Sequence, residues 1–275
     1  ADTTTTRIIL YAHPSGSTSY DNISVKAATI RDYSADIKGS GTNKTLTASG
    51  NAGIRSPHGN DGFQVSGYYA SALQFTNDGT NGSGNIDVIN VPTSSDFVFT
   101  GDVTMECWIY PRVTPSTNGV IFGQWLSGGG TNRNFIINFD TSNRVIAYFN
   151  SSATNYNTGT SPALSLNQWH HVAVEKDGSN FRLYLNGVCV GVNANTPTAG
   201  NTATVPFTIG SETDGSNGAD YGFNGYIQDV RVYKGVAKYK GGFDVPKPYN
   251  PTRSLETWRQ VSDTCKNNFA TMNPL

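Results

Sequence analysis

Paired carboxylates are the residues in this sequence that point most directly to catalysis. Hydrolysis of a glycosidic bond with retention of configuration uses two carboxyl groups about 5–5.5 Å apart, which a strand supplies when acidic residues occupy alternate positions. Glu175 and Asp177 have that spacing, but Asp177 begins a turn and is expected to leave the face of the strand. Glu106 has no acidic neighbour two residues away. The acidic residues therefore favour a protein that is not an enzyme.

Two adjacent histidines, His170 and His171, form the second group with possible chemistry. Neighbouring residues of an extended strand point to opposite faces, so these two imidazoles cannot bind one metal ion together. His13 and His58 are isolated in the chain. The histidines therefore predict no shared metal site.

Aromatic side chains near polar residues suggest the binding of a sugar. Such a site needs flat rings together with amide or charged partners on exposed loops. Trp125, Tyr156 and Tyr221, with Arg133, are the candidate glycan-binding residues. The alternative is that these rings pack inside the protein, as most aromatic side chains of a sandwich do.

Three short strands are predicted within residues 165–191, and they organise the rest of the chain. Residues 169–176 and 181–185 are rich in β-branched and aromatic residues and are separated by a turn at 177–180. Asn186-Gly187 predicts a two-residue type I′ hairpin, because both central residues of that turn need positive φ. Residues 188–190 form the return strand. Three antiparallel strands so closely spaced must bury a face against a second sheet.

The other segments repeat this pattern, so the sequence predicts an all-β fold of two packed antiparallel sheets. Further strands are predicted at residues 7–11, 72–75, 86–89, 97–99, 102–111, 120–126, 135–139, 145–149, 206–210 and 223–233. In the strand at 102–111, Met105, Cys107 and Ile109 share one face, and Glu106, Trp108 and Tyr110 share the other. The predicted core includes Trp108, Trp169, Leu183 and Ile227.

Two motifs carry a resemblance to a known family. Residues 169–173 (WHHVA) followed by 183–187 (LYLNG), and later residues 223–233 (FNGYIQDVRVY), resemble the signature of laminin-G-like domains of the concanavalin A-like jelly-roll superfamily. Gln228 stands where that family usually has an acidic residue. The resemblance implies a two-sheet jelly roll and a packed, structural role for His171.

The same resemblance implies a calcium ion at a loop rim. Calcium takes carboxylate and carbonyl oxygens as ligands. Asp214 and Asp220 are the candidate ligands, and Asp78, Asn85 and Asp87 are the second choice. The alternative is that these residues occur there because Asp and Asn favour turns.

Composition excludes several classes of partner. The net charge of −1 offers no bulk attraction to nucleic acid or to an anionic membrane, and no apolar run reaches the length of a membrane helix. Cys107, Cys189 and Cys265 cannot all pair within one chain, so free thiols are expected.

Residues 1–250 are predicted to form one sandwich with an N-terminal arm, and residues 251–275 a helical tail. Ser254 can cap a helix there. An apolar stripe at helical spacing is predicted to contact another subunit or protein during assembly; it contains Leu255, Trp258, Val261 and Phe269.

The segment at 44–52 and the ending at 230–239 resemble phage and marine-bacterial members of the family. This resemblance implies a bacteriophage virion protein, a decoration or fibre-associated subunit assembled in the host cytoplasm. Its expected partners are identical subunits or other virion proteins, together with host glycans. The alternative is an extracellular bacterial module for carbohydrate binding or adhesion.

Overall fold

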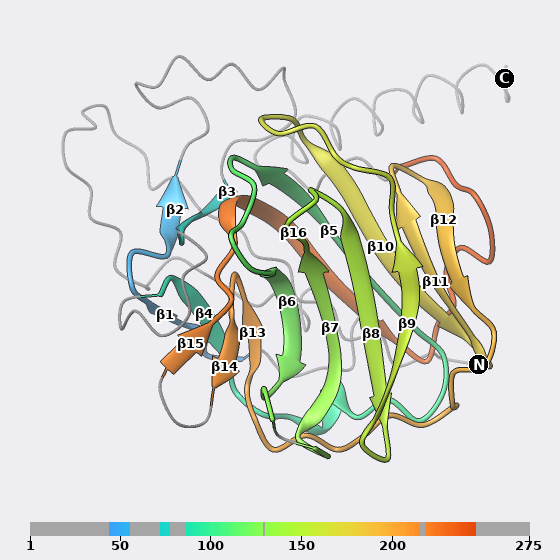
Figure 1. Cartoon of the computed structure of the whole chain (residues 1–275). Coiled ribbons are helices and arrows are strands. Elements are labelled where there is room, and N and C mark those ends of the chain that lie inside the picture. Colours follow the sequence, from blue (N-terminus) through green and yellow to red (C-terminus); the bar gives the residue numbers. More distant parts are fainter. Residues whose placement is uncertain (1–43, 56–71, 78–85, 129, 215–217, 246–275) are drawn as a thin grey trace, which may run out of the picture.

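Two seven-stranded antiparallel sheets pack face to face in the computed structural model, which describes residues 44–55, 72–77, 86–128, 130–214 and 218–245 (Figure 1). The sheet that faces the viewer, called the β6 sheet below, has the spatial order β1 (Thr47–Ser49), β4 (Val88–Val91), β13 (Phe207–Ile209), β6 (Gly119–Trp125), β7 (Arg133–Phe139), β8 (Val145–Ser151), β9 (Thr154–Thr160). The sheet behind it, called the β5 sheet, has the order β12 (Val188–Asn193), β11 (Asn180–Leu185), β10 (His170–Asp177), β5 (Val103–Pro111), β16 (Asn224–Lys234), β3 (Ala72–Thr76), β2 (Gly53–Arg55). The predicted two-sheet antiparallel jelly roll is confirmed.

The meander around residues 165–191 also has the predicted form. In β10 and β11, Val172 pairs with Leu185 and Asp177 with Asn180. The turn to β12 has φ of 49° at Asn186 and 83° at Gly187, the left-handed values that the Asn-Gly pair predicts.

Several elements differ from the sequence-based expectation, among them the short strands β1 and β2, which were not predicted. The predicted strand at 97–99 does not form. A 3₁₀ turn, η1 (Ser95–Phe97), ends at Phe97, and the Ser94 hydroxyl caps it by accepting a hydrogen bond from the N–H of Asp96. The polar strand β9 was not predicted. A small hairpin of β14 (Glu212–Asp214) and β15 (Gly218–Asp220) lies in a segment expected to be a loop.

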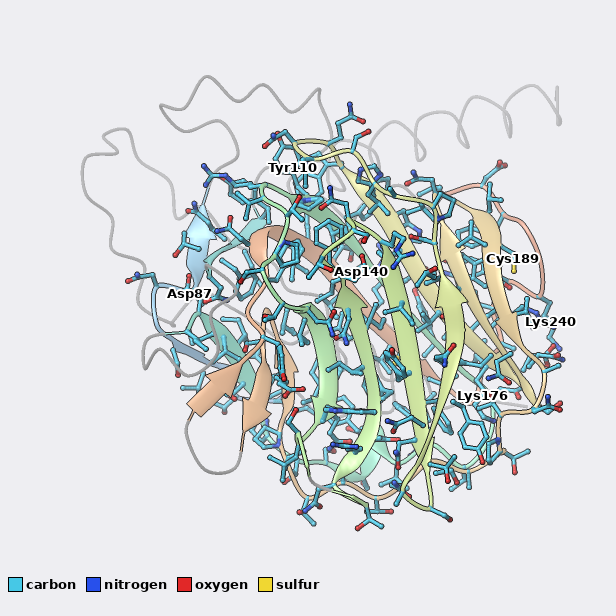
Figure 2. The ribbon with its side chains drawn as sticks, in the orientation of Figure 1. Asp87, Tyr110, Asp140, Lys176, Cys189 and Lys240 are labelled. Atoms are coloured by element: carbon cyan, nitrogen blue, oxygen red, sulfur yellow. The ribbon has the colours of Figure 1, made fainter. Side chains whose placement is uncertain are left out.

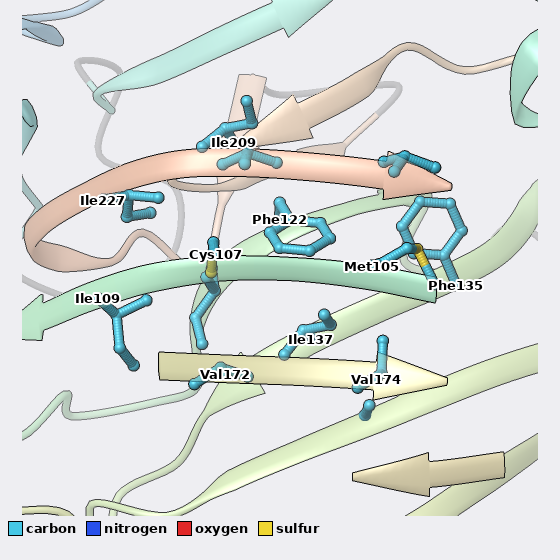
Figure 3. Packing of buried hydrophobic residues seen from close by; sticks show 14 of the residues in the cluster. Met105, Cys107, Ile109, Phe122, Phe135, Ile137, Val172, Val174, Ile209 and Ile227 are labelled. Carbon is cyan, nitrogen blue, oxygen red and sulfur yellow. The ribbon is translucent and has the colours of Figure 1, made fainter. Parts of the chain in front are cut away.

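The main core lies between the sheets, and strict alternation along β5 builds its centre. Met105, Cys107 and Ile109 point inward with no exposed surface, as predicted (Figure 3). Residues from both sheets meet them there, including Phe122, Phe135, Ile137, Val172, Val174, Ile209 and Ile227. Leu183 and Ile227 are core residues, as expected.

The two tryptophans assigned to the core lie elsewhere, which corrects that prediction. Trp108 is on the outer face of the β5 sheet, half-buried, with its ring edge-on to His171 at 5.2 Å. Trp169 is also half-buried and packs against Tyr110 in a small separate cluster. Both rings are sheltered without lying between the sheets.

The predicted strand at 7–11, the predicted tail at 251–275 and the assembly residues Leu255, Trp258, Val261 and Phe269 fall outside the described residues. Within the described ranges, no helix has the length and apolar character needed to cross a membrane.

Candidate functional site

The two glutamates that a hydrolase would need lie on the outer face of the β5 sheet, and both are buried. Glu106 on β5 is 1% exposed and Glu175 on β10 is 0% exposed. Residues 235–245, called the strap below, continue from β16 past β5, β10 and β11 and cover them. In Figure 1 this segment is the orange-red trace that ends beside β11 and β12. Lys240 of the strap lies at that rim, opposite the rim that holds Asp87 (Figure 2).

Glu106 is the centre of a buried ionic cluster. Its Oε1 lies 3.3 Å from Nη1 of Arg231 and 3.0 Å from Nζ of Lys238 in the strap. Tyr233 donates a hydrogen bond to Oε1 at 3.2 Å, and the Tyr239 hydroxyl donates to Oε2. Burial raises the pKa of Glu106, but Lys238, Arg231, His171 and the Tyr239 hydrogen bond together outweigh it and lower that pKa. The carboxylate is therefore kept ionised and fully occupied.

Glu175 is held by the backbone of the strap. The N–H of Lys240 donates to its Oε1 at 2.9 Å and to its Oε2 at 3.1 Å, and the N–H of Tyr239 also donates to Oε2. Tyr184 and Arg182 add donors from β11 at 3.1 and 3.3 Å. Asp177, its partner in the predicted catalytic spacing, instead lies 3.3 Å from Nζ of Lys240. Neither glutamate is free to act on a substrate.

Aromatic contacts hold the C-terminal part of the strap against the sheet. Tyr239 and Phe243 stack with centroids 3.4 Å apart, and Phe243 meets His171 edge-on at 5.7 Å. The small residue Ala173 lies between Glu106 and Tyr184 in the register of the sheet, which leaves room beneath the rings. The N–H of Phe243 donates to the carbonyl of Gly187 at 2.9 Å. The strap is thus packed as an integral part of the sandwich.

The histidines have structural surroundings. His171 is 1% exposed, and burial lowers its pKa from 6.5 to about 4 although Glu106 lies 3.7 Å away. The packed role that the resemblance implies for His171 agrees with this position. His170 has a ring nitrogen 2.9 Å from the carbonyl of Ser165, and burial lowers its pKa.

The opposite side of the sandwich presents the candidate sugar-binding residues. Trp125 ends β6 and pairs with Arg133 at the start of β7, so their side chains lie together on the outer face of the β6 sheet. The Arg133 guanidinium lies over the indole at 5.2 Å, and Tyr148 of β8 packs beside the indole at 6.3 Å. Ile136 fills the space between them. These four residues define the Trp125 face.

Of the four predicted glycan residues, Trp125 and Arg133 are in contact, and Tyr221 lies elsewhere along the same cluster. Tyr221 packs against the same apolar cluster as Trp125, beside Val120. Tyr156 does not join them, because it pairs with Phe149, whose side chain points into the core, and therefore lies on the other side of β9.

Trp125 has a supporting role among these residues, because its side chain is mostly buried. The residue is only 7% exposed, so the indole supports the face and does not serve as an open platform. Arg133, Tyr148 and Tyr221 are half-buried and supply the accessible part. Tyr148 was missed from sequence, although its position two residues after Ile146 in a strand was the signal that could have found it.

An amide network borders the Trp125 face. Asn201 donates to the carbonyl of Arg133 at 2.9 Å and also to the side chain of Asn150. Asn132 accepts from the backbone N–H and the hydroxyl of Thr204 at 3.3 and 2.9 Å. Amide groups of this kind hydrogen-bond readily with hydroxyl-rich ligands.

Calcium binding by Asp214 and Asp220 stays a prediction. The two residues lie in the β14–β15 hairpin, where Asp214 pairs with Gly218 and Asp220 with Glu212, and their side chains fall outside the described part. The carboxylate of Asp87 accepts hydrogen bonds from Asn51 and from Thr76 at 2.6 and 2.7 Å. Asp78 and Asn85 are outside the described residues. Within the ranges that are described, no group of three or more His, Cys, Asp or Glu is placed to hold a metal ion.

Comparison with known proteins defines the class. Residues 78–238, more than half of the chain, match the family described as the concanavalin A-like lectin/glucanases superfamily. The chain therefore belongs to that superfamily. No curated protein matches the chain.

Solved structures with the same fold include proteins that bind carbohydrate. Domain 4 of AbnA, an extracellular arabinanase of family GH43 from Geobacillus stearothermophilus solved with arabinotriose, is 20% identical; the match covers 75% of this chain and 91% of that one, with a TM-score of 0.50. Botulinum neurotoxin type C, whose cell entry depends on interaction with two ganglioside molecules, is 13% identical over 85% of this chain, with a TM-score of 0.54. The binding domain of Paraclostridial Mosquitocidal Protein 1 is 13% identical over 86%, with a TM-score of 0.51. The chain spans about half the length of the two toxin proteins, 48% and 51%.

Proposed function

We propose that this chain is a non-catalytic carbohydrate-binding sandwich and that it binds glycans on the Trp125 face. The observation that carries the proposal is the gathering of Trp125, Arg133 and Tyr148 on one outer face, bordered by amide groups. An apolar ring edge beside fixed polar groups is the arrangement that recognises a sugar, since each sugar has both an apolar face and hydroxyl groups.

The opposite face supports the non-catalytic part of the proposal. Glu106 and Glu175 are buried beneath the strap and are occupied by cations, hydroxyl groups and backbone N–H groups. A glycosidase needs an accessible acid and an accessible base or nucleophile. The purified protein should release no reducing sugar from polysaccharides, and activity that disappears in Glu106→Gln or Glu175→Gln would contradict this.

Glycan binding is tested with a matched pair of tyrosines. A glycan array identifies the ligand, and calorimetry then measures its affinity for the wild-type protein and two variants. Tyr148→Ala removes an exposed ring edge from the Trp125 face and should weaken binding about tenfold or more, in line with the energy of one buried aromatic contact. Tyr156→Ala removes a tyrosine from the neighbouring strand on its other side and should leave the affinity unchanged. Equal affinities for all three proteins would exclude this face, and an array without any bound glycan would exclude the function.

The finer proposal is that this module belongs to a bacteriophage virion. It is supported by the resemblance of residues 44–52 and 230–239 to phage members of the superfamily, and by a tail sequence whose apolar stripe fits a contact between subunits. Electron microscopy of the native assembly tests it: a symmetric array on a particle is expected. Recovery of the protein as a secreted or cell-wall-bound bacterial module, free of particles, would favour the extracellular alternative.

A shortened chain tests the assembly role of the tail. A protein that ends at Asn250 should fold with the spectrum and melting curve of the full chain, yet fail to join its oligomer or particle. Assembly as complete as that of the full chain would remove Leu255, Trp258, Val261 and Phe269 from this role.

A further inference from the structure

Two contacts hold the Arg133 guanidinium in place, and a third fixes the backbone of the same residue. Its Nε donates a hydrogen bond to the carbonyl of Leu126 at 3.0 Å, and its plane lies over the Trp125 ring at 5.2 Å. Its own backbone carbonyl accepts from Asn201 at 2.9 Å, which fixes the start of β7. The side chain is therefore oriented before any ligand arrives, and little rotamer entropy remains to be lost on binding.

Three other arginines of the sandwich have a carboxylate beside them, whereas Arg133, like the exposed Arg112, has none among the described residues. Arg144 pairs with Asp140 at 2.8 Å, and Arg182 and Arg231 each pair with two carboxylates. Across the described part of the chain, no acidic side chain forms an ion pair with Arg133, and its two terminal nitrogens have no hydrogen-bond acceptor. A half-buried cation stacked on an indole is stabilised by the ring, but the in-plane N–H groups stay available.

The available N–H groups have the geometry of a carboxylate receptor. Because Nε is committed to Leu126, the terminal fork of Nη1 and Nη2 is left, and two parallel N–H groups match the two oxygens of one carboxylate. Asn132 precedes Arg133, and its Oδ1 accepts from Thr204. Its Nδ2 is a further donor and has no acceptor among the described residues. Arg133 and Asn132 therefore both offer donors at this end of the Trp125 face.

We propose that the Trp125 face selects acidic sugars, with the carboxylate of a uronic or sialic acid bound by the Arg133 fork and the sugar ring lying against Tyr148. The inference rests on the proposed glycan-binding function and adds the chemical class of the ligand. Attraction by the whole protein does not explain such a preference, because the net charge is −1. The preference arises locally, at one oriented guanidinium.

The experiment compares each acidic sugar with a neutral counterpart. Calorimetry measures the binding of trigalacturonic acid and of its methyl ester, which keeps the sugar shape and removes the carboxylate charge. Sialyllactose and lactose form the second pair. The acidic member of at least one pair should bind about tenfold more tightly, the usual gain from hydrogen bonds to a charged group. The pair that shows the difference tells a uronic acid from a sialic acid as the source of the carboxylate.

Three variants assign the preference to Arg133. Arg133→Gln should bind both members of the pair alike, and Arg133→Lys, which keeps the charge but loses the fork, should retain only part of the preference. Arg144→Gln removes the same charge from the same sheet and should retain all of it. Melting curves show whether each variant is folded.

The outcomes separate this inference from the proposed function. Equal affinity for the acidic and the neutral member of both pairs in the wild-type protein, or a preference that survives Arg133→Gln, overturns the selectivity while glycan binding stands. Absence of binding to every neutral and acidic sugar overturns both.

Discussion

The carboxylate of Glu175 accepts hydrogen bonds from the backbone N–H of Lys240 at 2.9 and 3.1 Å, across 65 residues of sequence. This buried carboxylate is thus stabilised by hydrogen bonds from peptide groups of the strap, and Arg182 adds an ion pair at the rim. Through this contact, β10 holds a segment without regular secondary structure flat against the sheet.

Replacing Glu175 by Gln should destabilise the fold by about 2–3 kcal/mol, because the charge-assisted hydrogen bonds to the strap weaken and one acceptor oxygen is lost. Asp177→Asn is the matched control on the same strand. Its carboxylate is partly exposed and pairs with Lys240 at 3.3 Å, so its loss should cost less than about 1 kcal/mol. Urea unfolding monitored by tryptophan fluorescence gives both values. Equal losses of unfolding free energy in the two variants would show that the hydrogen bonds between the strap and Glu175 add no further stability.

Acid should weaken the fold through His171. Burial lowers its pKa to about 4 in the folded protein, while the unfolded chain has the ordinary value of 6.5. The unfolded state therefore binds more protons between these values, so stability is complete above pH 6.5 and falls as the pH drops toward 4. At pH 5 this residue should account for a loss of about 2 kcal/mol. The lowered pKa of Glu106 acts in the same direction below its unfolded value of 4.5.

His171→Phe provides the measurement for that pH effect. The variant keeps a ring between Trp108 and Phe243 but cannot be protonated. Its unfolding free energy should fall less than that of the wild-type protein between pH 7.5 and pH 5. Parallel pH curves for the two proteins would assign the acid sensitivity to other groups.

Because Trp169 lies outside the main core, its loss should destabilise the protein less than its size suggests. Leu183→Ala empties space between the sheets and should cost about 2–5 kcal/mol. Trp169→Ala removes a half-buried ring from the outer cluster with Tyr110 and should cost less than Leu183→Ala, despite the larger volume lost. Denaturation of both variants under the same conditions gives the order, and the reverse order would place Trp169 at the centre after all.

Two glycines separate the cost of a positive φ from the cost of displacing the strap. Gly178 and Gly187 both have positive φ, but a Cβ at Gly178 meets open space and a Cβ at Gly187 would overlap the carbonyl of Phe243. Gly178→Ala should cost about 1–2 kcal/mol for the left-handed conformation. Gly187→Ala should cost clearly more, because the strap must move. A thermal melt compares them, and equal shifts would mean that the strap yields freely at Phe243.

Alternation along single strands made much of this architecture predictable. The two faces of β5 follow directly from residues 105–110, and Asn186-Gly187 marked its turn because few residues tolerate positive φ. The contact of Trp125 with Arg133 could also have been predicted from the sequence, because both residues flank one hairpin. Tyr156 was misplaced because the face on which it lies depends on the register of β9 against β8, which its own polar sequence does not specify.

The burial of the outer face of the β5 sheet was not predictable from those patterns. Trp108 was assigned to the core because large rings are usually buried, yet the cover over its face comes from residues 235–245, which are rich in Gly and Lys and resemble an exposed loop. Contacts such as Glu106 with Lys238 join residues 132 positions apart. A local pattern has no information about a partner at that distance.

The path of the strap also decides how the domain carries mechanical load. A pull on the chain beyond Val245 first stretches the hydrogen bond between Phe243 and Gly187 and the stacked rings of Tyr239 and Phe243. The strap is covalently continuous with β16, which lies in the interior of the β5 sheet and pairs with β5 and β3 on its two sides. A pull from this end therefore reaches a central strand and not an edge strand such as β12 or β2. A sandwich connected in this way is suited to bear force between whatever it binds and whatever it is attached to.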